Sequence, residues 1–490
     1  MSTGKTITIS KIEYQELLDF KAEVALLKHE LAELRRMVFG QKRERFIPDD
    51  PAQGSLFNFP PNEVVETQKE NISYTRIKPK KGQKQPLRAE IPSYVPCREE
   101  IIEPKNIDKN SKRIGQRITE ILEYEPANIY VRKIICPKYL VETSDEETKI
   151  KVAPLPSLPI PKGNAGASII AHILVSKFTD HLPYYRQSKI FKRQGLYIPD
   201  STIGGWANIA TSRWLTPLWE AMKAKIVETD YLMADETPLP VLTEDKPGTT
   251  HRGYHWVYYD PIRKMAVFDY RESRGREGPK NFLKNFSGYL QTDGYQAYEK
   301  LAPPGRIKLL ACMAHVRRKY KNALGNDPKR AKKALTIIQN LYKLEREAQE
   351  QEFSYDEIKS LRQEKSVEIL EKFEKFLIEE KPRVLPQSAI GKAFGYTLHL
   401  WPRLKRYVDD GRLKIDNNLV ENSIRPVALG RKNYLFAGSH DGARNAAVIY
   451  SLLATCKLNN IEPFEWLKNA LETIPDYPAN QLHRLIPGLK

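Results

Sequence analysis

Apolar residues near the N-terminus recur at alternating spacings of three and four positions. This stripe consists of Leu17, Phe20, Val24, Leu27, Leu31, Leu34 and Val38. The positions between them are mostly charged or small, so the stripe is narrow, as in the a/d seam of a coiled coil. About three heptads fit within residues 1–46, which we expect to self-associate as a leucine-zipper-like coiled coil. An amphipathic helix that packs on its own chain is the alternative.

Polar and Pro-rich stretches follow this helix. Residues 47–90 are rich in Pro, Asn, Gln and charge, a composition typical of a basic polar linker. In residues 91–155, alternation of β-branched and polar side chains predicts a small β-rich module. The segment VAPLPSLPIPKG then marks a boundary, because repeated Pro interrupts regular structure.

Helical periodicity dominates residues 156–226, which we expect to form a helical DNA-binding region. The helix ASIIAHILVSKFTDHL precedes a second helix with Pro183 in its first turn and Gly195 at its end. A third helix begins behind the N-cap candidates Asp200 and Ser201. This order is the helix-turn-helix pattern, which many helix pairs share without binding DNA. The side chains that we expect to face DNA are Lys189, Lys192, Arg193, Thr202 and Trp206.

Short apolar runs with period-two alternation follow. They predict an antiparallel meander of three strands, Tyr231–Ala234, Tyr254–Tyr259 and Met265–Tyr270. A helix in GREGPKNFLKNF, a strand that ends at Asp293, a strand in IKLLACM and the basic helix AHVRRKYKNAL come next. Three strands, helix, strand, helix, strand, helix is the order of the RNase H-like fold, a mixed sheet flanked by helices.

The chain is therefore expected to be a multidomain α/β protein. Residues 227–325 form the first part of the RNase H-like core, and a long helical pattern predicts an insertion at 326–410. The final part of the core follows at 411–475, with a C-terminal tail at 476–490.

Three acids are placed where they could hold metal ions. Asp235 lies in the first strand and Asp293 ends the fourth, and these two strands are neighbours in the predicted topology. Glu421 is the best candidate for a third acid, on a helix 128 positions after Asp293. Phosphoryl transfer needs charge neutralisation, which two carboxylate-held Mg²⁺ ions provide. Glu236 points to the opposite strand face and is a weaker candidate.

Composition agrees with a polyanionic partner. The chain has 79 Lys+Arg against 61 Asp+Glu, a formal net charge of +18. Cationic side chains near phosphates release condensed counterions, so DNA is the favoured partner. No apolar run approaches the ~20 residues of a membrane span, and the N-terminus lacks a secretion-signal pattern, so we expect a cytoplasmic, nucleoid-associated protein.

The cysteines indicate neither disulfides nor zinc. The four cysteines, Cys97, Cys136, Cys312 and Cys456, are widely spread and contain no Cys-x-x-Cys pair. A disulfide framework is therefore not expected, and zinc is unlikely as a cofactor.

Several segments resemble the insertion sequence 66 family of bacterial transposases. They are MADETPLPVL, LQTDGYQAY, ACMAHVRRKY and, most specific, IDNNLVENSIRPVALGRKNYLFAGSHDGARNAAVIYSLLATCKLN. The resemblance implies DDE chemistry with Asp235, Asp293 and Glu421 as catalytic and metal-binding residues and Mg²⁺ or Mn²⁺ as cofactor. It also implies binding to terminal inverted repeats, strand cleavage, strand transfer and accessory proteins of the same element. The chain departs from the family pattern in one respect. The family commonly has a zinc-finger-like module with paired cysteines after the linker, whereas Cys97 and Cys136 have no partner cysteines here.

Basic and aromatic groups beside the acids are candidates for DNA contact. They open the helix after the fifth strand or follow Glu421, and Arg suits phosphate through its planar fork of donors. They are His315, Arg317, Arg318, Arg425, Arg431 and Lys432. Solvent-facing side chains without a DNA role are the alternative.

Two other functions remain open at this point. A non-mobile nuclease or integrase of the same fold would share the acids and the metal but would not join ends. A catalytically silent DNA-binding protein is signalled by the loss of one acid, and all three are present.

Overall fold

The computed structural model describes residues 129, 132, 138–142, 148–152, 157–160, 163–243, 248–299, 301 and 305–489. All of these except Ile129 fall within one unit, 131–490. The predicted coiled coil, the linker, Cys97 and Cys136 lie outside the described residues. Of the predicted β-rich module, an antiparallel hairpin of β1 (Lys138–Glu142) and β2 (Thr148–Val152) is described.

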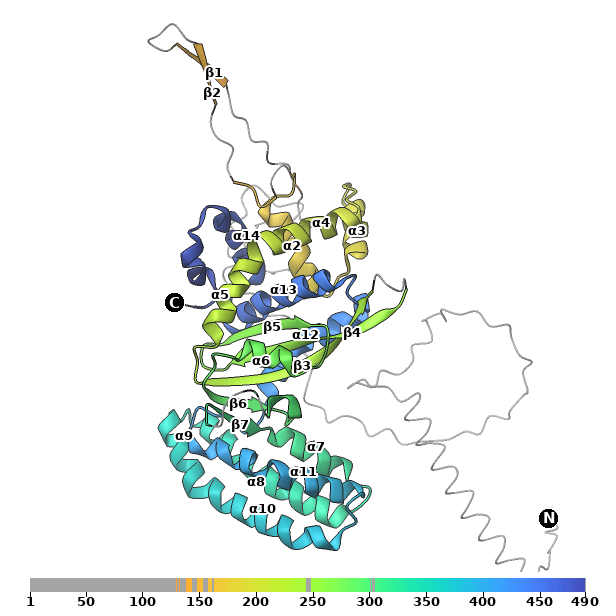
Figure 1. The fold of residues 1–490 in the computed structure, drawn as a ribbon, viewed down its shortest axis with the longest axis vertical. Coiled ribbons are helices and arrows are strands. Elements are labelled where there is room, and N and C mark those ends of the chain that lie inside the picture. The colour runs from red at the N-terminus through yellow and green to blue at the C-terminus, as the bar shows by residue number, and fades with distance from the viewer. Residues whose placement is uncertain are drawn as a thin grey trace, which may run out of the picture. The chain divides into compact units, whose positions relative to one another are not determined.

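A five-stranded mixed sheet lies at the centre of the described chain, in the order β5-β4-β3-β6-β7 (Figure 1). β3, β4 and β5 are antiparallel, whereas β6 and β7 continue from β3 in parallel. The mixed sheet and the meander are thus confirmed. The strands are β3 (Tyr231–Leu242), β4 (Thr250–Asp260), β5 (Met265–Arg271), β6 (Gly288–Thr292) and β7 (Ile307–Ala311).

The connections around the sheet differ from expectation at one place. Helix α6 (Glu277–Phe282) joins β5 to β6, as predicted. The order of the RNase H-like fold has a helix between β6 and β7, whereas the sequence indicates a turn at Gly294, and the described residues there hold only a 3-10 turn at Gln296–Tyr298. Asp293 and Gly294 begin this connection with an Asx turn, in which the Tyr295 amide donates to Asp293 Oδ1 at 2.8 Å. Such side-chain capping competes with a helical start.

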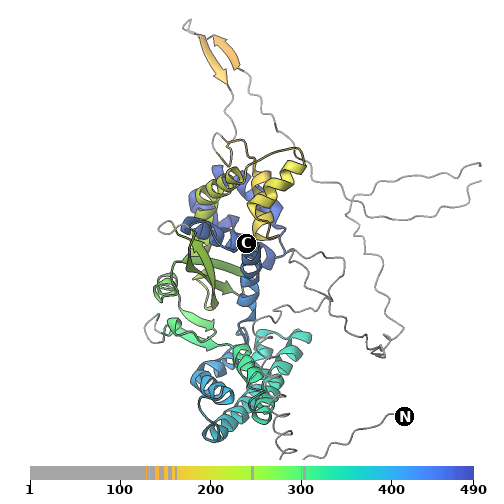
Figure 2. The same cartoon turned by 90° about the vertical axis from the view of Figure 1, so that its right-hand side faces the viewer.

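Helices from both ends of the described chain pack together on one side of the sheet (Figures 1 and 2). Two hydroxyls of α13 bond the outer edge of β5: the Phe268 amide donates to Ser451 Oγ at 2.8 Å and the Ala266 amide to Thr455 Oγ1 at 3.2 Å. These bonds satisfy backbone groups that an edge strand would otherwise expose. The helices are α2 (Ala167–Phe178), α3 (Tyr184–Arg193), α4 (Asp200–Ala210), α5 (Thr216–Ile226), α13 (His440–Leu458) and α14 (Pro463–Thr473).

The turn between α3 and α4 follows the predicted pattern with one correction. Gly195 has φ +88°, a left-handed conformation that suits a residue just past a helix C-terminus. The N-cap of α4 is Pro199, and the predicted caps Asp200 and Ser201 are the first two helical residues. The carboxylate of Asp200 accepts only the neighbouring Ser201 amide at 3.0 Å, so it does not cap the second or third helical amide.

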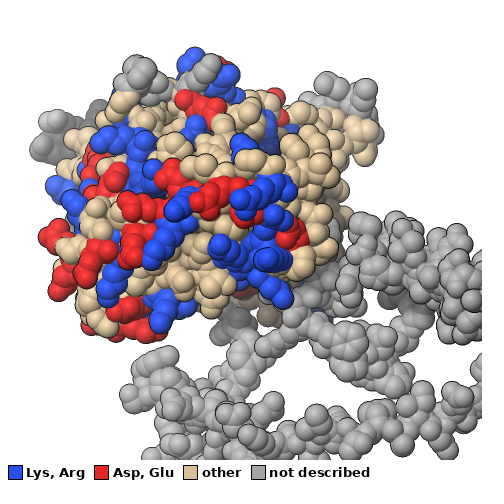
Figure 3. All heavy atoms as spheres, turned by 90° about the horizontal axis from the view of Figure 1, so that it is seen from below, with Lys and Arg blue, Asp and Glu red and all other residues tan. Residues whose placement is uncertain are grey.

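A second group of helices packs beyond β7 (Figure 1). Their buried faces recur at helical spacing, as at Ala334, Ile338 and Leu341 of α8. On the face seen in Figure 3, basic and acidic side chains are interspersed, without a broad patch of one sign. The helices are α7 (Met313–Asn322), α8 (Pro328–Glu350), α9 (Tyr355–Leu361), α10 (Val367–Glu380) and α11 (Ala389–Leu404).

A buried arginine joins these helices to the chain that returns to the sheet. Arg362 is 1% exposed and forms an ion pair with Glu345 at 2.6 Å. Its other guanidinium nitrogen donates to the carbonyls of Tyr407 and Asp410, both at 3.0 Å. The arginine thus fixes α8 to the segment that leads into the last helices.

We predict that Arg362→Met destabilises the protein by about 3 kcal/mol, because it leaves a carboxylate and two carbonyls without their buried donor. Urea unfolding of the full chain measures the change. Arg383→Met is the matched control: Arg383 pairs with Glu380 but is 65% exposed, so about 1 kcal/mol or less is expected. Equal losses in the two variants would contradict the role of Arg362.

Candidate active site

Asp235 and Asp293 meet at adjacent parallel strands. In the register of β3 and β6, Met233 pairs with Gln291. Each acid stands two positions after its member of this pair, Asp235 within β3 and Asp293 just past the end of β6, so the two carboxylates lie beside each other. Neighbouring strands are about 4.8 Å apart. The two acids that the sequence predicted to converge are brought together.

The environment of Asp235 disfavours a bare negative charge. Burial is the main cause that raises its pKa, to about 8, and the carboxylates of Glu236, Asp293 and Glu421 add to the effect. The Glu236 amide donates to Asp235 Oδ1 at 2.8 Å and partly opposes the shift. Three like charges around a buried carboxyl are stable together only with a proton or a cation among them.

A network of hydrogen bonds directly before α12 (Asn418–Tyr434) positions the third acid, Glu421. The side chain of Asn417 is fully buried and donates to the Ala234 carbonyl at 3.1 Å, next to Asp235. The Asn417 amide donates to Cys312 Sγ at 3.2 Å, and the Met313 amide to the Ile415 carbonyl at 3.1 Å. The start of α12 is thereby fixed to both β3 and α7, with Glu421 in its first turn.

Glu421 faces the N-terminal turn of α7. His315 Nδ1 lies 3.7 Å from Glu421 Oε1, and an Arg318 nitrogen lies 3.8 Å from Oε2. Ligand atoms of Cys312, His315 and Glu421 all lie within 4.8 Å of one another. Burial is the main cause that lowers the pKa of His315, partly opposed by Glu421. Burial raises the pKa of the Cys312 thiol to about 12.

The side chain of Glu236 is buried beside the site but already has a cationic partner. Its carboxylate forms an ion pair with Arg274 at 2.5 Å, and Arg274 lies over the Tyr295 ring at 4.0 Å. Burial raises the pKa of Glu236, and the Arg274 contact opposes this shift. Among the described residues, Asp235 forms no ion pair with a cationic side chain, so it retains the greater need for a cation.

The residues present fit a divalent cation. Carboxylate oxygens are the preferred ligands of Mg²⁺ and Mn²⁺, and Asp235, Asp293 and Glu421 supply them from three elements. In addition, Glu421 Oε1 and His315 Nδ1 are buried and have no hydrogen-bond partner. Unsatisfied buried polar atoms are rare in folded proteins and point to a missing partner.

Three residues of the site were missed by sequence reasoning. Arg274 lies in the loop after β5, where its position among several charged residues gave no signal. Asn417 lies inside the segment IDNNLVEN, directly before the helix of Glu421. An Asn at this place is usually interpreted as a helix cap, although here two Asn residues in a row could have signalled a further role. Cys312 precedes a helix as an isolated cysteine, for which burial gives the more frequent explanation.

The predicted DNA-contacting residues fall into separate groups. Lys189, Lys192 and Arg193 lie exposed on α3, whereas Thr202 and Trp206 on α4 are half-buried and Trp206 packs against the core. On α7 and α12, the predicted side chains that are exposed are Arg317, Arg318, Arg425 and Lys432, the last of them near the end of α12 that lies away from Glu421. Arg431 is half-buried and donates to the Pro238 carbonyl, and His315 faces Glu421.

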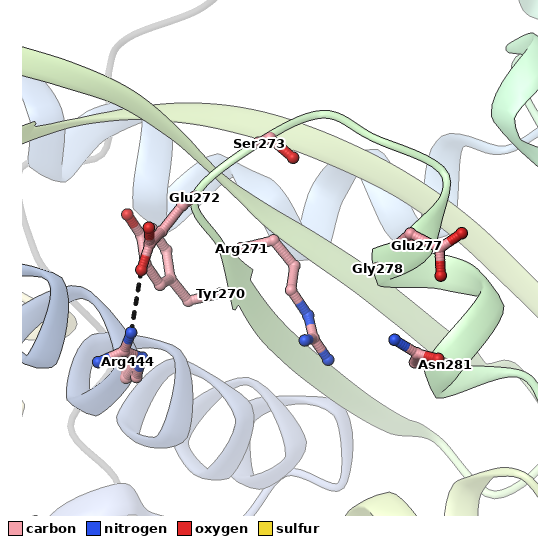
Figure 4. A pocket seen from close by; sticks show the side chains of 8 residues that line it. All are labelled: Tyr270, Arg271, Glu272, Ser273, Glu277, Gly278, Asn281 and Arg444. Atoms are coloured by element: carbon pink, nitrogen blue, oxygen red, sulfur yellow. Dashed lines mark hydrogen bonds and ion pairs between the residues drawn. The ribbon is translucent and has the colours of Figure 1, made fainter.

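A pocket of about 270 Å³ lies away from the three acids (Figure 4). It opens between the C-terminal end of β5, α6 and the start of α13. Arg444 forms an ion pair with Glu272 at 3.1 Å inside it. Its lining contains Tyr270, Arg271, Glu272, Ser273, Glu277, Gly278, Asn281 and Arg444, and therefore none of the acids of the site.

Comparison with known families identifies the family of this chain. The profile of the transposase IS66 family matches residues 162–445, which include all three acids. The chain belongs to the IS66 transposase family. The IS66 C-terminal element matches residues 451–487, and a profile described as transposase C of IS166 homeodomain matches residues 26–96. The resemblance seen in the sequence is thus confirmed.

Curated relatives of this family member extend over most of its length. The uncharacterized protein y4jD of Sinorhizobium fredii is 32% identical over 502 aligned positions, covering 96% of this chain and 94% of that protein. Another uncharacterized protein of that organism, y4qI, is 30% identical over 488 positions, covering 95% and 88%. Uncharacterized protein YuaK of Escherichia coli is 49% identical over 49 residues, covering 10% of this chain and 52% of YuaK. Among the described residues, none of the helices has the length and apolarity needed to cross a membrane.

We predict that Asp235→Asn removes a pH dependence of stability from this transposase-family chain. With its pKa raised to about 8 from 3.8, folded Asp235 retains a proton that the unfolded chain releases. Its contribution to stability is therefore complete below pH ~4 and is lost as pH rises through ~8.

Without divalent ions, the variant should exceed the wild type in stability at pH 9 by on the order of a few kcal/mol, and by little at pH 4. Urea unfolding in chelator across this range measures the difference. If the stabilities of the wild type and the variant changed with pH in parallel, the pKa of Asp235 would not be raised in the folded protein.

Proposed function

We propose that the protein is a DNA transposase that binds the terminal inverted repeats of its element and catalyses metal-dependent strand cleavage and strand transfer. The convergence of Asp235 and Asp293 on adjacent parallel strands, with Glu421 brought to them by α12, is the observation that carries the proposal. The strand order, three antiparallel strands followed by two parallel ones, supports an RNase H-like core.

In this mechanism the three acids hold Mg²⁺ or Mn²⁺. Such ions, when bound, neutralise the scissile phosphate and lower the pKa of an attacking water or 3′-hydroxyl. Asp235 would supply an oxygen from within β3, where the backbone pairs with β4, and Asp293 from just past the end of β6. Glu421 adds a carboxylate from the first turn of α12. Arg318 is more than half exposed and can move from Glu421 to a DNA phosphate.

DNA binding is assigned to the exposed basic face of α3. Lys189 and Lys192 lie near the rings of Tyr185 and Tyr197, at 5.6 and 5.8 Å. Phosphates suit the cations, and exposed aromatic rings offer stacking surfaces. Arg186 of the same helix donates to Asn433 Oδ1 at 3.1 Å, so α3 contacts the far end of the helix that bears Glu421.

Self-association belongs to the same proposal. Two element ends must be held together for strand transfer, and the heptad stripe of residues 1–46 provides a means of pairing two subunits. Accessory proteins of the same element are further proposed partners, on the basis of family membership alone.

We predict that Asp235→Asn, Asp293→Asn and Glu421→Gln each reduce cleavage of element-end DNA by about 1000-fold or more. Each change removes a metal-binding charge worth several kcal/mol in the transition state. Affinity for the DNA should stay within about threefold, because phosphate contacts elsewhere supply it. Cleavage mapping on labelled DNA and equilibrium binding in chelator give the two quantities.

Glu277→Gln is the control, since Glu277 is a carboxylate on α6 with a 74% exposed side chain. Cleavage without end joining by the wild type would support a non-mobile nuclease. Specific binding without any cleavage would support a silent DNA-binding protein. Full activity in one of the three acid variants would refute the assignment of that acid.

We predict that Mg²⁺ and Mn²⁺ support cleavage and Ca²⁺ does not. Calcium binds oxygen ligands at 2.3–2.6 Å with loose geometry, whereas Mg²⁺ demands octahedral bonds of about 2.1 Å. In-line attack depends on the tighter arrangement. Cleavage assays after chelation and addition of each metal ion test this, and cleavage that persists in excess chelator would rule out a metal mechanism.

A further inference from the structure

Two polar atoms without partners face each other within the candidate active site. His315 Nδ1 and Glu421 Oε1 are both buried, and neither has a hydrogen-bond partner. They are 3.7 Å apart, which is too long for a hydrogen bond between them. Leaving two buried polar atoms unsatisfied is destabilising, so the pair indicates a missing third group.

The separation of the two atoms suits a bridging cation. Metal bonds to an imidazole nitrogen and a carboxylate oxygen are about 2.1 Å long, so one cation could contact both atoms across this separation. The other oxygen of Glu421 faces Arg318, and Cys312 Sγ accepts the Asn417 amide. Nδ1 of His315 is therefore the potential metal ligand on this side of the site that lies near Glu421 Oε1 and has no other partner.

We infer that His315 is a metal ligand, paired with Glu421, and that its nitrogen donor makes this cation site prefer Mn²⁺ over Mg²⁺. The inference rests on the proposed function, because it takes Glu421 as part of the cation site. Mg²⁺ selects oxygen ligands, whereas imidazole suits transition-metal ions. A mixed nitrogen–oxygen pair therefore penalises Mg²⁺ more than Mn²⁺. His315 then acts through the metal ion, and direct contact with DNA is not its main role.

The test is pulsed electron paramagnetic resonance on the full chain with Mn²⁺ as the only added metal. The wild type should show coupling between Mn²⁺ and the ¹⁴N of a coordinated imidazole, and His315→Asn should lack it while still binding Mn²⁺. Titration calorimetry should show that the ratio of the Mg²⁺ and Mn²⁺ dissociation constants falls about tenfold in His315→Asn, because an oxygen donor replaces nitrogen.

Two further variants keep the test decisive. His399→Asn changes a histidine whose side chain is 65% exposed and should leave the nitrogen coupling and the metal preference unchanged. Glu421→Gln should weaken Mn²⁺ binding about tenfold or more, independently of His315. Circular dichroism confirms that each variant is folded.

The outcomes separate the inference from the proposed function. Absence of nitrogen coupling in the wild type, with Mn²⁺ binding that depends on Glu421, would overturn the role of His315 and leave the carboxylate site intact. If the nitrogen coupling persisted in His315→Asn, the coordinated imidazole would belong to another histidine, which would also overturn the role of His315. Mn²⁺ binding that is insensitive to Glu421→Gln would overturn both.

Discussion

The position of one short segment, residues 414–417, determines whether the candidate active site exists. Gln291 donates to the Lys414 carbonyl at 2.9 Å, and the Lys414 amide donates to the Tyr231 hydroxyl at 3.0 Å. Asn417 adds the bond to the Ala234 carbonyl. These contacts lie across β3 and β6, so a segment far along the chain is held at the strands that carry Asp235 and Asp293. Because the groups involved are largely buried, loss of one partner leaves an unsatisfied polar atom in the core.

The helices inserted before this segment support the same position. Tyr342 of α8 donates to Asp416 at 2.8 Å, and Tyr396 of α11 donates to the Asp293 carbonyl at 2.7 Å. Gly294 has φ +92°, and a Cβ atom there would lie 2.8 Å from Leu400 of α11. The long excursion of the chain therefore packs closely against the end of β6. Helix α11 thereby stabilises the position of the loop that begins at Asp293.

The sequence predicted the strands and the acids more accurately than the network between them. Period-two alternation identified the meander, because β3, β4 and β5 are regular and buried, and the positions of Asp235 and Asp293 followed from the strand order. The turn predicted at Gly294 is present as an Asx turn, and it takes the place of the helix that the RNase H-like order has between β6 and β7. The contact of His315 with Glu421 joins residues 106 positions apart, and no local pattern encodes such a pairing. Arg431 illustrates the same limit, since its sequence context suggests phosphate binding but its guanidinium contacts Pro238.

Helix α12 connects the proposed chemistry to the proposed DNA-binding face. Glu421 lies in its first turn and Asn433 near its end, 12 positions later, a distance of about 18 Å along the axis. At the far end, Arg186 bonds Asn433, and Lys177 of α2 lies 3.6 Å from the Tyr184 ring centre and 5.4 Å from that of Tyr434. Arg431 ties the same end to β3, the strand of Asp235. Because α12 joins Glu421 to α3, the length of this helix sets the distance between the proposed metal site and the proposed DNA-binding face.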